Sequence, residues 1–553
     1  MSRATLWVML SWLCVCALAK VRRLDNSVDY ISSADSLKVS PKITKGMVID
    51  AGSGGSRLHV YNWKPRVFTT LPPSLSYPTA DENWTARMAP GIATLADYDS
   101  IMKHLSPLID FAKNVLVGFE DEYYAYPIYF KATGGMRELT VEKREEIMTN
   151  VRKLLSDKSF CPFYFRSDMA RVISGEEEAI FSWSAINFLM GNLLPLSEGI
   201  GEANTALNGT YGTLDLGGAS SQIAFFIPTQ DIMEGLFKLQ IGAMKHWNVY
   251  TKSYLSFGHV SARERHLVNV ASSTKDDSIV NYCFHAGYSE NVVAPRDTST
   301  KTVEVKGPAS PTSDAFDKCR ELLIPLLNKN NAFCTSVYFD QCAIDGAYQP
   351  SLPAGQKFIG TSSYKYAWNI LMLQSTASFQ EFKRKAKFVC SLSFSDAMLY
   401  SDNNNLSTTD EKLSEIVPYF CFLSVYTYVL LQDGFGFTDE QSITVLDQVN
   451  GNKVGWALGA ILHEINTLPW ELATPGTDFG PLFIAACIGI ILGAIIVFFL
   501  SKELLTEHKL TLSTANGLSN SRFSETSDSG ENWQERITQY NPFDKKHKYN
   551  IIA

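Results

Sequence analysis

The sequence predicts an α/β protein of two related lobes with a cleft between them, and three observations support this. Strand-like runs alternate with helical patterns from residue 46 onward. A glycine-rich motif, DAGSGGSRL at residues 50–58, recurs as DLGGASSQI at residues 215–223. The second copy opens the order strand, turn, strand again at residue 211. Repetition of one strand–turn–strand unit followed by helices indicates two lobes of the same design.

The elements of the first lobe follow from the residue patterns. Alternating apolar residues predict three strands, at residues 47–50, 58–63 and 126–130. Helical spacing of apolar residues predicts two helices, at residues 97–116 and 141–155.

Each copy of the glycine motif predicts a strand, a tight turn and a returning strand. Asp50 and Asp215 each end an apolar run, with a glycine two residues later and a serine six residues later. Glycines let backbone N–H groups approach phosphate oxygens, and an Asp at a strand end can hold a hydrated Mg²⁺ or Ca²⁺, directly or through its waters. Two such turns facing each other would clamp a phosphate chain, whereas the simpler reading is two ordinary hairpins.

Two further segments lie between the copies. Residues 131–137, KATGGMR, read as a third glycine turn with Thr133 placed to donate to a phosphate, or as a plain strand-to-helix turn. Residues 174–179, SGEEEA, open an apolar helix that runs to about Met190. Acids at a helix start are favoured by the helix dipole, but one of the three carboxylates could also act as a general base on an attacking water.

Composition restricts the class of protein. A chain of 553 residues has room for more than one domain, and 45% hydrophobic with 19% charged residues is typical of a folded protein with membrane segments added. The net charge is −8 and no basic face is evident, so nucleic acid is excluded as a partner.

The two ends of the chain predict a single-pass type I membrane protein. Arg3, an apolar stretch and the small residues at 17–19 indicate a signal peptide over residues 1–19, although an uncleaved signal anchor fits the same pattern. Residues 20–45 form a polar lead-in. Residues 481–500 are an uninterrupted apolar run, long enough for a transmembrane helix, with lysines after it. This places residues 501–553 in the cytosol as a tail whose composition indicates disorder.

Other features of the chain agree with a luminal or extracellular location. Three N-glycosylation sequons precede the apolar run, at Asn83, Asn208 and Asn405. Seven cysteines share this region, and an odd number leaves at least one free or bonded to another molecule. No CxxC spacing is present, which argues against a zinc site. The tail carries NPF at residues 541–543 and YNII at residues 549–552, which fit sorting-adaptor signals or arise by chance.

The motifs together resemble a known family. DAGSGGSRLHVY at 50–61, KATGGMREL at 131–139, GEEEAIFSWSAINFLMG at 175–191 and YGTLDLGGASSQIAF at 211–225 are similar, in order, to the conserved regions of the nucleoside triphosphate diphosphohydrolases, which include ecto-apyrases and Golgi nucleoside diphosphatases. Two later segments, 421–437 and 455–469, also fit. The resemblance implies two RNase H-like lobes of the actin, Hsp70 and hexokinase type, with lobe I at residues 46–177 plus 440–470 and lobe II at residues 178–439.

The resemblance also implies roles for individual residues. Glu178 aligns with the catalytic base, Gln222 and Ser220 with groups around the attacking water, and Asp50 and Asp215 with acids that hold a Ca²⁺ or Mg²⁺ through waters. The expected phosphate-binding residues are Ser53, Gly54, Gly55, Ser56, Thr133, Gly217, Gly218 and Ala219. Either Tyr364 or Tyr366 would stack on the nucleobase. The chain departs from the family pattern at Gly134, Ala179 and Ser221, but no charged catalytic group is lost.

By the same resemblance the cysteines pair as Cys283–Cys319, Cys334–Cys342 and Cys390–Cys421, which leaves Cys161 unpaired.

The function expected is metal-assisted hydrolysis of the terminal phosphate of nucleoside di- or triphosphates. Alternatives are a sugar kinase or exopolyphosphatase of the same superfamily, and a nucleotide-binding receptor without catalysis. The sequence does not decide between triphosphates and diphosphates, between bases, or between the Golgi and the cell surface, and it leaves the oligomeric state open. The single C-terminal anchor and the sorting-like tail favour the Golgi or endomembrane system slightly.

Overall fold

The computed structural model describes residues 42–503, apart from 70, 72, 96, 194–208, 228–234, 242–244, 296–298, 330–340, 407–415, 450, 474–485 and 487. The chain divides into two compact units, residues 1–473 and 474–553. The expected signal peptide and most of the lead-in and cytosolic tail lie outside the described residues, as do Asn208 and Cys334.

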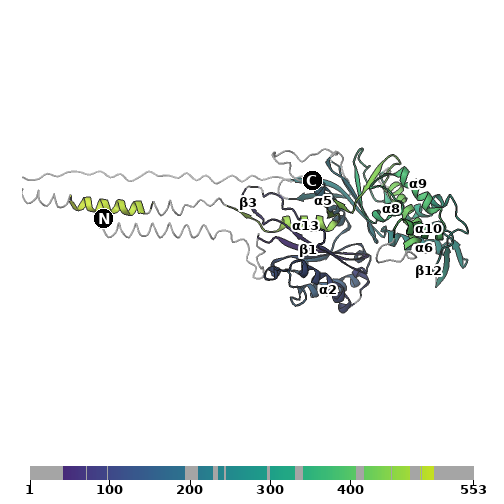
Figure 1. The fold of residues 1–553 in the computed structure, drawn as a ribbon, viewed down its shortest axis with the longest axis horizontal. Coiled ribbons are helices and arrows are strands. Elements are labelled where there is room, and N and C mark those ends of the chain that lie inside the picture. Colours follow the sequence, from purple (N-terminus) through teal and green to yellow (C-terminus); the bar gives the residue numbers. More distant parts are fainter. Residues whose placement is uncertain are drawn as a thin grey trace, which may run out of the picture. The chain divides into compact units, whose positions relative to one another are not determined.

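A five-stranded sheet forms the first lobe of the larger unit (Figure 1). Its order is β4 (Thr85–Met88), β2 (Gly55–Asn62), β1 (Lys45–Gly52), β5 (Ile128–Ala132) and β6 (Ala170–Val172). β1 pairs antiparallel with β2 and parallel with β5. The helices of this lobe are α2 (Tyr98–Val115), α3 (Gly134–Arg137) and α4 (Val141–Ser156). The predicted helices at 97–116 and 141–155 are therefore confirmed as α2 and α4.

Side-chain caps explain where these two helices begin. The Asp97 carboxylate accepts a hydrogen bond from the Ser100 N–H at 2.9 Å, and the Thr140 hydroxyl accepts one from the Lys143 N–H. Both caps satisfy N–H groups that have no partner inside the helix. The apolar faces of α2 and α4 then pack on the sheet in one continuous core.

A seven-stranded sheet forms the second lobe. Its order is β15 (Thr376–Ser378), β16 (Ser442–Val445), β14 (Phe358–Ser362), β7 (Gly212–Leu216), β8 (Ser220–Phe226), β10 (Lys245–Leu255) and β9 (Leu236–Ile241). Around it lie α6 (His259–Ser272), α7 (Ala315–Leu323), α8 (Tyr364–Ile370), α9 (Phe379–Cys390), α10 (Phe394–Asn403), α12 (Phe420–Tyr428) and a π-helix, Val429–Gly434.

The smaller sheets lie outside these two. A three-stranded sheet has the order β11 (Ser278–Val280), β13 (Thr300–Lys306) and β12 (Ser289–Pro295), and it packs with α6 in a small core of its own. Two short ribbons are β17 (Gln448–Val449) with β18 (Asn452–Lys453), and β3 (Val67–Phe68) with β19 (Glu471–Leu472).

The two large sheets repeat one arrangement of five strands. In the first sheet β4, β2 and β1 are joined antiparallel, and β5 and β6 follow parallel to β1. In the second sheet β10, β8 and β7 are joined antiparallel, and β14 and β16 follow parallel to β7. The predicted α/β fold with a repeated unit is confirmed. The two glycine motifs form equivalent turns, one between β1 and β2 and the other between β7 and β8.

Two long helices, α5 (Gly175–Leu189) and α13 (Trp456–Thr467), pack against each other between these sheets. Side chains on nearly every face of α5 are buried. Its Trp183 ring packs edge to face with Trp247 on β10, with the two ring centroids 6.1 Å apart. On α13, a Cβ at Gly459 would lie 1.9 Å from the Phe181 carbonyl oxygen, so the helix backbones touch there. Both helices lie in one core that also contains residues of β8, β9 and β10, so this core joins the two sheets. The expected lobe boundary at residue 178 falls inside α5 and is therefore wrong.

The expected return of the chain to the first lobe at residue 440 is too early. β16 pairs with β14, so residues 442–445 still belong to the second sheet. After β16, the next residues buried in the core of the first sheet are those of α13.

Disulfides tie together the helices of the second lobe. Cys283 bonds Cys319 on α7, and Cys390 on α9 bonds Cys421 on α12. Cys342 is also disulfide-bonded, but its expected partner lies outside the described residues. Cys161 is buried and free, as expected.

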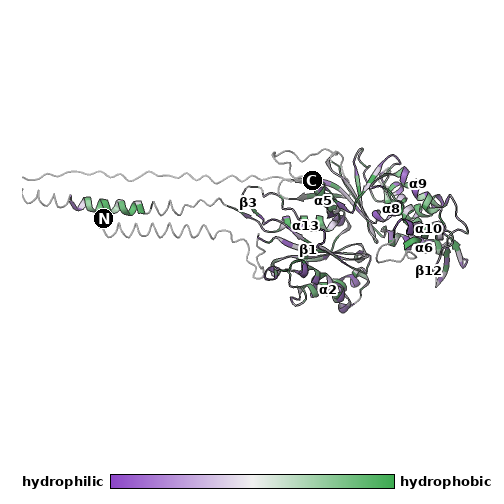
Figure 2. Cartoon of the chain, in the orientation of Figure 1, coloured by the Kyte–Doolittle hydropathy of each residue, from purple (hydrophilic) through white to green (hydrophobic). Residues whose placement is uncertain are grey.

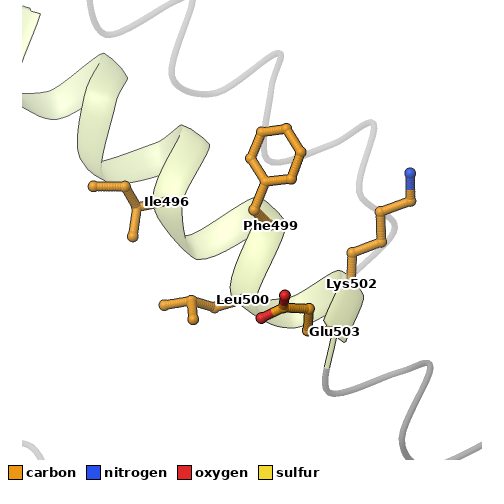
Figure 3. Close-up of a pocket in the computed structure, with 5 residues that line it drawn as sticks. All are labelled: Ile496, Phe499, Leu500, Lys502 and Glu503. Atoms are coloured by element: carbon orange, nitrogen blue, oxygen red, sulfur yellow. The ribbon is translucent and has the colours of Figure 1, made fainter.

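The smaller unit contains an apolar helix over residues 488–503, which is green along most of its length in Figure 2. Among the described residues, no helix is both long and apolar enough to cross a membrane. Figure 3 shows a hollow beside this helix, lined by Ile496, Phe499, Leu500, Lys502 and Glu503. All five side chains come from one helix and no second element closes the hollow among the described residues, so it is not a candidate ligand site.

The α5–α13 contact predicts that Gly459→Ala destabilises the protein by about 1–3 kcal/mol, because the added methyl group forces the helices apart. Thermal unfolding of the full-length chain measures this. The control is Gly455→Ala, where a Cβ meets nothing within 4 Å. Because Gly455 is the N-cap of α13, this control also shows the cost of Ala at that end of the helix. A melting temperature of Gly459→Ala equal to that of the parent would show that the helices do not touch at Gly459.

Candidate active site

The two glycine turns face each other in direct contact. A Cβ on Gly218, in the second turn, would lie 2.6 Å from the Ser53 Oγ of the first turn. The third glycine segment closes on the same point, because a Cβ on Gly134 would lie 2.8 Å from the Ser220 Oγ. Only residues without a side chain allow this approach. The backbones of all three segments therefore converge at one place.

The hydrogen bonds at the start of α5 hold two of its three acids, Glu177 and Glu178, in different directions. The Ser174 hydroxyl accepts a hydrogen bond from the Glu177 N–H at 3.1 Å, and the Glu177 carboxylate accepts one from the Ser174 N–H at 3.0 Å. This capping box turns Glu177 toward β6, where Arg171 donates to both of its carboxylate oxygens at 2.6 and 2.8 Å. Glu178 then points the other way and is buried.

A polar cluster surrounds the Glu178 carboxylate. Gln222 Nε2 lies 3.3 Å from Glu178 Oε2, 2.8 Å from Ser220 Oγ and 3.0 Å from Ser253 Oγ. Arg137 donates to the same Glu178 oxygen at 2.7 Å and to Ser220 Oγ at 3.0 Å. Three residues expected around an attacking water are therefore joined by direct hydrogen bonds.

Arg137 was not among the residues predicted for the site. It ends the KATGGMR segment, and its other nitrogen donates to the Ile173 carbonyl at 3.1 Å. Its partners lie 36 to 83 residues further along the chain. The only feature of the sequence that could have indicated a role for Arg137 was its position, as a charged residue just after the glycine turn.

The two aspartates occupy equivalent strands, and the charge of Asp215 acts on Asp50. Asp50 lies on β1 with an Arg57 nitrogen 3.6 Å from its carboxylate, and Asp215 lies on β7, where the Ser182 hydroxyl donates to it at 3.2 Å. Burial raises the pKa of Asp50 to about 6, and the Asp215 charge adds to this. The pKa of Asp215 is also raised, chiefly by burial.

These two carboxylates fit a hydrated divalent cation. A cation near both would relieve the burial and mutual repulsion that raise their pKa values. No group of three or more His, Cys, Asp or Glu side chains that could hold a metal occurs among the described residues. Two carboxylates provide too few ligands for a closed protein site, so water or phosphate oxygens must complete the coordination.

Burial raises the pKa of Glu178 to about 7. The Arg137 cation opposes this shift, while the charges of Asp215 and Asp50 add to it. A carboxylate with a pKa near neutral pH can accept a proton from water and release it again, as a general base must.

Two of the predicted contacts do not hold. The Ser56 side chain is fully buried, and its hydroxyl bonds His104 Nε2 at 2.9 Å, on the face of the sheet that packs on α2. The Ser56 hydroxyl therefore cannot bind phosphate. The Tyr364 ring is fully buried in the core of the second lobe, while Tyr366 is 47% exposed. Of the two candidates for base stacking, only Tyr366 presents its ring to solvent.

The other predicted residues lie at or beside the turns. Ser53 and Gly54 form the tip of the β1–β2 turn, and Gly55 opens β2 with a φ of 149°, which favours glycine. The second turn comprises Gly217, Gly218 and Ala219. Thr133 is buried beside the first turn, and its N–H donates to the Ala51 carbonyl at 3.1 Å. Asn83 and Asn405 are exposed.

Comparison with known proteins identifies the family. The sequence model of the GDA1/CD39 (nucleoside phosphatase) family matches residues 38–477. The chain belongs to this family. Its relatives include the Golgi apyrase of Saccharomyces cerevisiae, 26% identical over 75% of this chain and 69% of that protein. Ectonucleoside triphosphate diphosphohydrolase 1 of Bos taurus is 29% identical over 83% of this chain and 89% of that protein.

Among solved structures, a nucleoside triphosphate hydrolase from Neospora caninum is similar with a TM-score of 0.48 and 14% identity, over 83% of this chain and 97% of that one. That score is too low to add to the family assignment, which rests on the sequence.

The raised pKa of Asp50 predicts a stability that depends on pH. Between the unfolded value of 3.8 and the folded value of about 6, the metal-free folded chain binds the proton more tightly than the unfolded chain, so stability falls as pH rises through this window. Asp50→Asn removes the penalty. The variant should be more stable than the parent at pH 7.5, by up to roughly 3 kcal/mol, and about equal to it near pH 4.

Thermal melting with a chelator at both pH values measures this. Adding Mg²⁺ or Ca²⁺ at pH 7.5 should raise the melting temperature of the parent more than that of the variant. A variant that is less stable than the parent at pH 7.5 without metal would contradict the assignment of Asp50 as a strained, charge-bearing site residue.

Proposed function

We propose that this nucleoside phosphatase hydrolyses the terminal phosphate of nucleoside di- and triphosphates by attack of a water molecule activated by Glu178. The observation that carries the proposal is the set of hydrogen bonds joining Glu178, Ser220 and Gln222 beside two facing glycine turns. A base, a water-orienting amide and a phosphate-binding turn are the parts that direct hydrolysis requires.

The glycine turns bind the terminal phosphate. Backbone N–H groups of residues 53–55, Gly218 and Ala219 donate to its oxygens, helped by the hydroxyls of Ser53 and Ser220. The Gly217 N–H, predicted to do the same, is already bonded to the Ser220 carbonyl at 2.9 Å within the turn. Donors fixed in place before the reaction stabilise the charge that develops on phosphate oxygens in the transition state. Thr133, in the third segment, adds a further donor from the first lobe.

Nucleoside phosphatases of this family need a divalent cation. In this chain Asp50 and Asp215 would hold it through water, and oxygen ligands favour Mg²⁺ or Ca²⁺ over softer metals. When bound, the cation neutralises negative charge on the phosphate oxygens.

Glu178 removes a proton from the attacking water. The Gln222 amide, which bonds both Glu178 and Ser220, orients that water between the base and the phosphate. Arg137 holds the carboxylate in place and keeps a larger fraction of it ionised at neutral pH, because the cation opposes the effect of burial. The Glu178 carboxyl then carries the proton until product leaves. Because the water oxygen forms the new bond to phosphorus while the bond to the leaving nucleotide oxygen breaks, no covalent phosphoenzyme forms.

The nucleobase lies against the second lobe. Tyr366, in the first turn of α8, follows the end of β14, and β14 pairs with the strand that carries Asp215. Its exposed ring offers a flat apolar surface for stacking.

The reaction takes place in the secretory lumen or outside the cell. The signal-like start, the sequons at Asn83, Asn208 and Asn405, and the apolar run at 481–500 support a single-pass type I membrane protein. The similarity to a Golgi apyrase supports the Golgi, where UDP or GDP is the expected substrate. A cell-surface enzyme would instead act on ATP or ADP, and NPF and YNII in the tail are candidates for binding sorting adaptors.

Replacing the base tests the proposal. In the full-length chain purified from a secretory host, Glu178→Gln should lower kcat for phosphate release by about 10² to 10⁴-fold, because the amide cannot accept the proton. Release from ATP, ADP, UDP and GDP is measured with Mg²⁺ or Ca²⁺. The ratio of UDP and GDP rates to ATP rates decides between the Golgi and surface roles.

Glu176→Gln is the matched control, since it removes a carboxylate from the same first turn of α5 and should leave activity within about twofold of the parent. If the folded parent binds nucleotide but releases no phosphate, the hydrolase proposal fails and the receptor hypothesis replaces it.

A further inference from the structure

A row of charged side chains crosses the first sheet at the level of Asp50. Strand pairing places Asp50 opposite Arg57 on β2, and Arg57 opposite Arg87 on β4. In the other direction, Asp50 is in register with Lys131 on β5, and Lys131 with Arg171 on β6. Residues directly opposite each other on paired strands share a face. Four cations and one acid therefore line one face of this sheet.

Three of the four cations have a carboxylate partner. Lys131 pairs with Glu464 on α13 at 2.6 Å, Arg171 pairs with Glu177, and Arg57 lies 3.6 Å from Asp50. Arg87 differs. In the described part of the chain its one hydrogen bond is to the Gly54 carbonyl, at 3.3 Å, and it forms no ion pair. It is also exposed.

The second sheet has the equivalent row without the positive charge. There Asp215 is opposite Gln222, and Gln222 is opposite Ser253, which accepts its amide hydrogen bond at 3.0 Å. The positions of Arg57 and Arg87 in the first sheet are thus held by neutral side chains in the second. The second turn adjoins the Glu178 carboxylate, which Arg137 already pairs at 2.7 Å, whereas the first turn adjoins two arginines and one carboxylate, Asp50.

Two arginines directly opposite each other on neighbouring strands repel, which lowers the stability of the sheet. A ligand that brings negative charge to the pair removes this cost. The position of Arg87 fits such a ligand, because its guanidinium bonds the tip of the first phosphate-binding turn and a Cβ on Gly54 would meet nothing within 4 Å. The tip of this turn therefore has open space beside Gly54, the residue whose carbonyl Arg87 bonds.

From this asymmetry we infer that Arg87, together with Arg57, binds the non-terminal phosphates of the nucleotide and so favours triphosphates over diphosphates. The inference rests on the proposed function. The terminal phosphate lies beside Glu178, where further negative charge would be repelled. The remaining phosphates therefore extend along the first turn toward the arginine pair. A triphosphate has two of these groups and a diphosphate has one, so the triphosphate gains more from the guanidinium charges.

The test compares Arg87→Gln with the parent, both full-length, using ATP and ADP with Mg²⁺. The KM for ATP should rise about 10-fold and that for ADP by no more than about 3-fold, while kcat for both stays within about twofold. Arg87→Lys should recover most of the ATP affinity, since it restores the charge. Inorganic tripolyphosphate should lose more potency than pyrophosphate as a competitor, which separates phosphate contacts from base contacts.

Arg166→Gln is the matched control. Arg166 is exposed, is paired with Asp168 and precedes β6. Because β6 is parallel to β5 and β1, while the first glycine turn follows the end of β1, Arg166 lies toward the opposite end of the strands from that turn. Its loss should leave both KM values unchanged. Equal effects of Arg87→Gln on ATP and ADP, or no effect on either, would overturn the inference even though the parent hydrolyses both. Absence of hydrolysis by the folded parent would instead overturn the proposed function, so the two failures are distinguishable.

Discussion

Burial of three carboxylates within range of one another's charge is the constraint on which the site depends. Burial raises the pKa values of Glu178, Asp50 and Asp215, and charge from the neighbouring acids adds to the shift in Asp50 and Glu178. Such a cluster costs stability unless something neutralises it. Arg137 and Arg57 do so in part, and a divalent cation with its phosphate would do the rest. In the proposed mechanism, binding of the metal and nucleotide would therefore relieve the repulsion among these carboxylates in the free protein.

The cluster is held together by a strand arrangement that occurs in both sheets. The same five-strand arrangement brings Asp50 and Asp215 to equivalent turns, and glycines let the two turns touch. The two halves then differ in side chains. One row carries Arg57 and Arg87, the other Gln222 and Ser253. Duplication supplies two turns that could bind one phosphate. In the proposed mechanism, the difference between the rows would place the attacking water on the second side and the remaining phosphates on the first.

Much of this arrangement could be predicted from local patterns. The repeated glycine motif predicted both hairpins, and the caps at Asp97 and Thr140 begin helices within a residue of where apolar spacing placed them. Ser56 was misplaced because alternation along a strand turns its hydroxyl to the opposite face from Arg57. Arg137 and Arg87 were missed because their contacts join segments far apart in the chain. Residue types alone do not reveal pairing across a sheet or between lobes.

The most direct measurement is hydrolysis in water enriched in ¹⁸O, with mass spectrometry of both products. If water bound between Glu178 and Gln222 attacks the terminal phosphorus, one ¹⁸O atom per turnover enters inorganic phosphate and none enters the nucleotide. Label in the nucleotide product would place the attack on an inner phosphorus, and a phosphorylated protein trapped during turnover would mean that a side chain attacks first. Either result would contradict the role assigned to Glu178.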